Sequence, residues 1–154
     1  MIYFAYGSNM DWERITAPDR APSAQFLLRA TLPEHELRFT RRSDKQRTGT
    51  ADVVPQAGSL VWGAVFHVED QDSDRLDSAE GVNSGAYRRE HVTVFLENDR
   101  SRPLLRVRTY VVCQKKSEHQ APAQWYLDHI LKGARRWGLP ADYVARLETI
   151  EVAR

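Results

Sequence analysis

Tyr3-Phe4-Ala5-Tyr6-Gly7-Ser8-Asn9-Met10 is a short aromatic segment that runs directly into a small polar turn. Residues 2–6 are apolar and rich in aromatics, which predicts a buried strand. Gly-Ser-Asn ends this strand, and a short helical turn is expected over residues 10–15. Backbone N–H groups converge in such a strand-to-helix turn and can bind an anion or an oxyanion. An ordinary strand-ending turn has the same composition, and the glycine spacing and lysine of a P-loop are absent.

The rest of the chain adds further strands and then two helices. Leu60 to Val68 is the clearest strand, because its apolar residues alternate onto one face. A polar helix is expected from Asp70 to Glu80, ended by Gly81. The other predicted strands are 24–32 and 36–40, separated by Pro33, then 51–54, 87–96 and 104–112, and the other predicted helices are 122–138 and 140–150. Runs of strands followed by helices indicate the α+β class with a mainly antiparallel or mixed sheet.

Length and charge narrow the classes of function. The chain has 154 residues, which fits a single domain spanning residues 1–154. Its 22 basic and 21 acidic side chains give a net charge of +1, which argues against nucleic acid or an anionic membrane as partner. No run is long enough for a membrane span and no signal peptide is evident, so a cytoplasmic location is expected. Trp12, Trp125 and Trp137 could lie in a core or an interface, which leaves monomer and homodimer both open.

The sequence shows no pattern typical of a disulfide, a metal site or a serine nucleophile. Cys113 is the single cysteine, which excludes an intrachain disulfide and a multi-cysteine zinc site. Its place in an apolar strand predicts a small core residue. The five histidines show no spacing typical of metal ligands, and no Gly-x-Ser-x-Gly elbow is present. Neither a metal ion nor another cofactor is expected.

Two further segments could carry chemistry. Glu80 would sit at the C-terminal end of a helix, where the macrodipole disfavours a carboxylate and raises its pKa. Gly81 and Gly85 leave room for a ligand, so this carboxyl could act as a general acid and base. A solvated surface glutamate is the alternative interpretation. The basic stretch Arg38 to Arg47 is expected to be a solvated loop, with carboxylate or RNA binding as the less favoured role.

Taken together, these segments resemble the γ-glutamylcyclotransferase-like family. The resemblance begins at residues 3–10 and continues, in the family's order, through Val61-Trp62-Gly63-Ala64-Val65-Phe66, Leu76-Asp77-Ser78-Ala79-Glu80-Gly81-Val82 and Gly85-Ala86-Tyr87. Tyr126, Gly133-Ala134 and Gly138-Leu139-Pro140 also fit, so the similarity covers nearly the whole chain. The glutathione-specific branch of the family carries Gly-Ser-Leu in its loop, and Asn9 sets this chain apart from that branch.

The resemblance implies a small mixed or antiparallel β-barrel flanked by helices, with a cavity at one end. It implies that Glu80 is the catalytic acid and base. The substrate-binding residues that it implies are Tyr6, Gly7, Ser8, Asn9, Tyr87 and Tyr126. The implied reaction closes the glutamyl α-amine onto its own γ-carbonyl, releasing 5-oxoproline and a free amine or amino acid from a small-molecule γ-glutamyl amide. Two alternatives stay open on the same fold: a γ-glutamyl amidase that hydrolyses the bond, and a non-catalytic metabolite-binding protein.

Overall fold

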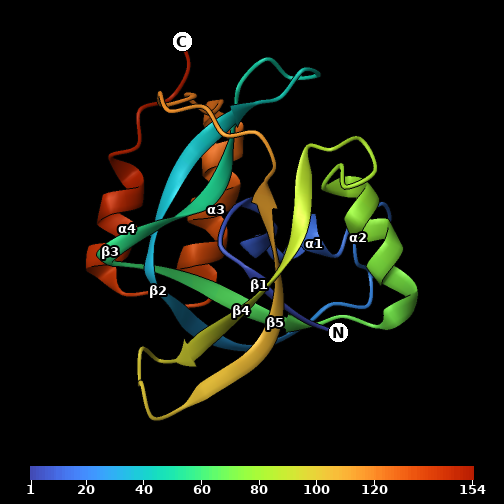
Figure 1. The fold of residues 1–154 in the computed structure, drawn as a ribbon, viewed down its shortest axis with the longest axis vertical. Helices are drawn as coiled ribbons and strands as arrows, with labels where there is room; N and C mark the ends of the chain where they lie inside the picture. The colour runs from blue at the N-terminus through green and yellow to red at the C-terminus, as the bar shows by residue number, and fades with distance from the viewer.

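The computed structural model describes residues 1–154, and its five strands form a closed barrel in the order β1-β3-β2-β4-β5 (Figure 1). The strands are β1 (Ile2–Ala5), β2 (Gln25–Arg42), β3 (Gly49–His67), β4 (Tyr87–Leu96) and β5 (Pro103–Val112). All neighbouring pairs are antiparallel except β1 and β5, which close the barrel in parallel at Tyr3 and Arg108. The predicted α+β class with a small mixed barrel is therefore confirmed.

Helical segments surround the barrel. They are η1 (Ser8–Met10), α1 (Trp12–Ile15), η2 (Asp70–Asp72), α2 (Ser73–Ala79), α3 (Gln124–Arg136) and α4 (Ala141–Glu148). Helices α3 and α4 lie together beside the long β2–β3 hairpin, whereas α2 lies on the other side of the barrel (Figure 1). None of these helices combines the length and the apolar character that crossing a membrane requires.

Each of the two longest strands was predicted from the sequence as two shorter strands. The segments expected at 24–32 and 36–40 are one strand, β2, and those expected at 51–54 and 60–68 are one strand, β3. Pro33 does not interrupt β2, because the pairing with β3 shifts register between Pro33 and His35 and Glu34 takes a φ of 59°. A bulge of this kind accommodates a proline without ending the ladder.

Residues 61–66 of strand β3 bury both faces rather than the predicted single face. Phe66 and Ala64 are fully buried as expected, but Val61 and Val65 on the opposite face are fully buried as well. The alternation failed as a guide because the barrel interior covers one face and the surrounding elements cover the other. An aromatic cluster forms part of this covering layer. The ring of Trp137 stacks on that of Phe26 with 4.0 Å between ring centres, and it meets the ring of Phe66 edge-on with 5.9 Å between ring centres.

Two predictions about single residues are resolved by the fold. Cys113 is exposed rather than buried, because β5 ends at Val112 and the chain leaves the barrel there. Trp12 and Trp137 pack against the hydrophobic core, while Trp125 on α3 is 42% exposed.

Gly133 permits the close approach of α3 to η1. A Cβ atom at position 133 would lie 2.4 Å from the backbone carbonyl carbon of Met10, which is far inside contact distance. Gly133→Ala should therefore lower the free energy of unfolding by about 1–3 kcal/mol, the usual cost of overpacking. Chemical denaturation measures this loss. Arg135→Ala, on the exposed side of the same helix, should cost under about 1 kcal/mol; equal losses in the two variants would contradict the close-approach argument.

Candidate active site

A cavity of about 430 Å³ opens where β1 and β2 end and where β3 and β4 begin. Its size suits a small organic molecule. All seven residues singled out from the sequence line this cavity, namely Tyr6, Gly7, Ser8, Asn9, Glu80, Tyr87 and Tyr126. They come from four separate regions of the chain, so the fold brings together what the sequence keeps up to 120 positions apart, from Tyr6 to Tyr126.

The turn after β1 forms one wall of the cavity. Gly7 precedes the short helical turn η1, and no side chain caps that turn. The first N–H groups of a helical turn have no partners within it, so they remain available to a ligand. A side chain at position 7 would crowd the wall, because its Cβ would lie 3.2 Å from the Cβ of Ala51. The turn is anchored to α3, since the indole Nε1 of Trp137 donates to the carbonyl of Met10 at 2.7 Å.

Glu80 lies at the C-terminal end of α2, as predicted. Gly81, with a φ of 68°, ends the helix. The Glu80 side chain is only 16% exposed, and its Oε1 accepts a hydrogen bond from Asn9 Nδ2 at 2.7 Å. Burial raises the pKa of this carboxyl, although nearby Arg20 and the Asn9 hydrogen bond act in the opposite direction. The predicted rise in pKa is thus present, and its main cause is burial.

Asn9 holds the Glu80 carboxyl in place. Its Nδ2 donates to Glu80 Oε1 and also to the Tyr3 hydroxyl at 3.0 Å. Its Oδ1 accepts from Arg20 Nη1 at 3.1 Å, and the same Nη1 lies 3.9 Å from Glu80 Oε1. Because every polar atom of the Asn9 amide has a partner, the amide has one favoured orientation, and the carboxyl that it contacts is fixed with it.

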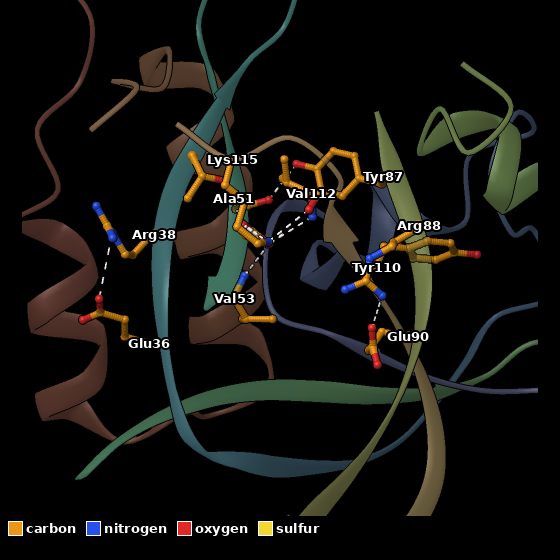
Figure 2. A network of polar contacts seen from close by, with 12 residues as sticks. Glu36, Arg38, Ala51, Val53, Tyr87, Arg88, Glu90, Tyr110, Val112 and Lys115 are labelled. Carbon is orange, nitrogen blue, oxygen red and sulfur yellow. Dashed lines mark hydrogen bonds and ion pairs between the residues drawn. The ribbon is translucent and has the colours of Figure 1, made fainter. Parts of the chain in front are cut away.

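Two tyrosines line the part of the cavity around Ala51, next to the turn at Gly7. The hydroxyl of Tyr87 donates to the carbonyl of Ala51 at 2.6 Å, and the hydroxyl of Tyr126 accepts from the Ala51 N–H at 3.0 Å. Figure 2 shows Tyr87 reaching toward Ala51. Burial raises the pKa of both phenols, so both are neutral at physiological pH. The Tyr126 hydroxyl accepts a hydrogen bond here, so its own O–H can still donate to a further acceptor. The O–H of Tyr87 already donates to a backbone carbonyl.

Sequence reasoning did not single out Arg14 and Arg20, and it gave carboxylate binding by the stretch Arg38 to Arg47 only as the less favoured role. Arg14 and Arg20 line the cavity from α1 and the loop that follows, and Arg14 Nε donates to Ser8 Oγ at 3.0 Å. Arg41 and Lys45, from the end of β2 and the turn after it, line it as well. The stretch expected to be a solvated loop is partly strand, because β2 continues to Arg42. The positive charge of residues 38–47 was visible in the sequence, but the direction of each side chain depends on strand pairing.

The fold and the cavity define a class, a five-stranded mixed barrel with a small-molecule cavity at one end. Residues 60–147 match the AIG2-like family. The chain is 34% identical, over 97% of its length, to the gamma-glutamylcyclotransferases of Homo sapiens and Bos taurus, and it covers 78% of each. A solved structure named gamma-glutamyl cyclotransferase superposes with a TM-score of 0.89 at 32% identity, covering 99% of this chain and 89% of that one. The chain belongs to the AIG2-like, γ-glutamylcyclotransferase-like family.

Proposed function

We propose that the protein is a γ-glutamylcyclotransferase that converts a γ-glutamyl amide into 5-oxoproline and a free amine or amino acid. The observation that supports this best is the buried Glu80 carboxyl, held by Asn9 in the same cavity as the uncapped turn at residues 7–9. A carboxyl beside backbone N–H donors supplies an acid and base next to an oxyanion site. The names of the relatives fit this chemistry.

In the proposed reaction Glu80 first takes a proton from the substrate's α-ammonium group. The free amine then attacks the γ-carbonyl carbon, which forms the new C–N bond of a five-membered ring. The amides of Gly7, Ser8 and Asn9 stabilise the oxyanion of the tetrahedral intermediate. Glu80 returns the proton to the departing nitrogen, and the oxyanion re-forms the carbonyl as the amide C–N bond breaks. The second proton of the ring nitrogen then passes through the regenerated Glu80 carboxylate to the released amine, which leaves as an ammonium.

Two contributions to catalysis are available in this cavity: orientation of the reacting groups and stabilisation of the oxyanion. The nucleophile and the carbonyl belong to one molecule, so binding the glutamyl group in a folded conformation can recover part of the roughly 7–11 kcal/mol that good orientation contributes. One oxyanion donor adds about 2.7–4 kcal/mol to stabilisation of the transition state. A base with a raised pKa is also better matched to an ammonium, because proton transfer becomes less uphill as the two pKa values approach each other.

Product analysis tests the proposal directly. The wild-type protein is incubated with γ-glutamyl-alanine, and the products are identified by mass spectrometry beside an enzyme-free control. We expect 5-oxoproline and alanine in equal amounts. Glutamate and alanine would instead identify an amidase that uses the same cavity. Saturable binding of γ-glutamyl compounds without any product would identify a non-catalytic binding protein.

A further inference from the structure

The cavity carries more positive charge than a γ-glutamyl group requires. Its charged lining consists of two acids and four cations, which are Asp19, Glu80, Arg14, Arg20, Arg41 and Lys45. A bound γ-glutamyl group carries one ammonium and one carboxylate, so it is neutral overall. The surplus of two positive charges is therefore left for the other half of the substrate, the part that departs as the leaving amine.

The four cations divide into two pairs by position. Arg14 and Arg20 are hydrogen-bonded to Ser8 and Asn9 of the turn, and Arg20 lies beside Glu80. Since the α-ammonium must reach Glu80, the α-carboxylate on the same carbon falls near this first pair. Arg41 and Lys45 come from the far end of β2 and the turn after it. Neither forms an ion pair with an acidic side chain, although the charge of Arg41 helps to lower the pKa of Glu80.

Arg41 and Lys45 occupy an ordered rim rather than a loose loop. The turn that follows β2 is closed by hydrogen bonds from Ser43 N to Thr48 O at 2.9 Å and from Arg47 N to Ser43 O at 2.7 Å. The Arg41 guanidinium lies 5.9 Å from the ring centre of Tyr87, which keeps it over the cavity. An arginine without an acidic partner in a cavity is well suited to bind a carboxylate, which it can hold through two parallel hydrogen bonds.

We propose, resting on the proposed function, that Arg41 and Lys45 form a subsite for an anionic leaving group. The favoured substrates are then γ-glutamyl dipeptides whose second residue is acidic, such as γ-glutamyl-glutamate. The leaving amino acid of such a dipeptide brings two carboxylates, which match the two cations. Arg41 is the principal specificity determinant, because it is half-buried, whereas Lys45 is exposed and more strongly screened by salt.

The test compares γ-glutamyl-glutamate with its neutral isostere γ-glutamyl-glutamine, with 5-oxoproline as the readout. The wild type should show a kcat/KM about 10-fold or more higher for γ-glutamyl-glutamate, as expected for charge-assisted hydrogen bonds to the extra carboxylate. Arg41→Gln should bring this ratio close to one without reducing kcat/KM for γ-glutamyl-glutamine to the same extent. The wild-type ratio should also fall as the salt concentration rises.

Arg42→Gln is the matched control. Arg42 neighbours Arg41 on β2 but is exposed, does not line the cavity, and donates to the carbonyl of Arg47 instead. Its variant should keep the wild-type ratio. A wild-type ratio near one, or an Arg41→Gln variant that keeps the preference, would overturn the subsite while leaving 5-oxoproline formation intact. Calorimetric binding of the same two dipeptides identifies a failure of the proposed function alone. Tighter binding of γ-glutamyl-glutamate without any 5-oxoproline would refute the proposed function and support the subsite.

Discussion

Glu80→Gln should lower kcat for 5-oxoproline formation by about 10²- to 10⁴-fold, the range typical of a lost general acid and base. Glutamine keeps the shape of the side chain and can still accept the hydrogen bond from Asn9 Nδ2 through its amide oxygen. It cannot take up the proton of the substrate ammonium. KM should therefore change little while kcat falls. Glu69→Gln, a change at an exposed position outside the cavity, should leave both constants near their wild-type values.

The raised pKa of Glu80 also predicts how stability and kcat/KM depend on pH. Burial raises the folded-state pKa of Glu80 above its ordinary value of 4.5, so the folded protein binds a proton more tightly than the unfolded chain does. Stability then falls as pH rises from 4.5 through the raised pKa, and the full cost is present above that raised pKa. At pH 7 the Gln variant should accordingly be at least as stable as the wild type. In the wild type, kcat/KM should decline as pH drops through the raised pKa, because the base becomes protonated.

Asp52→Ala should cause the largest loss of stability, at least about 3 kcal/mol in the free energy of unfolding. The Asp52 side chain is fully buried on β3. Its Oδ2 accepts from Lys115 Nζ at 2.6 Å and from Thr40 Oγ1 at 2.7 Å. Its Oδ1 accepts from the backbone N–H groups of Val53 and Val112 at 2.9 and 3.1 Å. Removing the carboxylate leaves these donors without their partner in the barrel interior.

Figure 2 shows Val53, Val112 and Lys115 gathered around this network, beside Tyr87 and Ala51. The network therefore ties β3 to β5 directly behind the tyrosines of the cavity. Urea denaturation measures the effect, with Asp70→Ala as the control. The Asp70 side chain is 98% exposed and pairs only with the N-terminus, so its removal should cost under about 1 kcal/mol. A loss that small for Asp52→Ala would show that the buried network contributes little.

Local features of this protein could be predicted from its sequence, because neighbouring residues determine them. The strand and turn at residues 2–9 and the helix that ends at Glu80 depend on short-range composition and on Gly81. The continuity of β2 through Pro33 could not be predicted, since the bulge exists only when β3 pairs alongside it. The burial of residues 61–66 of β3 on both faces likewise depends on Trp137, which follows much later in the chain and packs on Phe66.

The candidate site divides in the same way. The turn at residues 6–9 and Glu80 can be recognised in the sequence from their residue types and local spacing. The resemblance to a family assigns both to one site. The contact between Asn9 and Glu80 joins positions 71 residues apart. No local pattern specifies such a contact. In the sequence Arg20 looks like an ordinary surface arginine and Arg41 like part of a solvated basic stretch. Only the three-dimensional fold brings both side chains to one cavity.

Turnover of γ-glutamyl-alanine in water enriched in oxygen-18 tests the central claim most directly, with wild type and Glu80→Gln compared by mass spectrometry. Intramolecular attack uses no water, so the wild type should release 5-oxoproline without any label, and the variant should release almost none. Glutamate carrying one labelled oxygen would show that water is the nucleophile. Unlabelled 5-oxoproline formed by the variant at the wild-type rate would remove Glu80 from the mechanism.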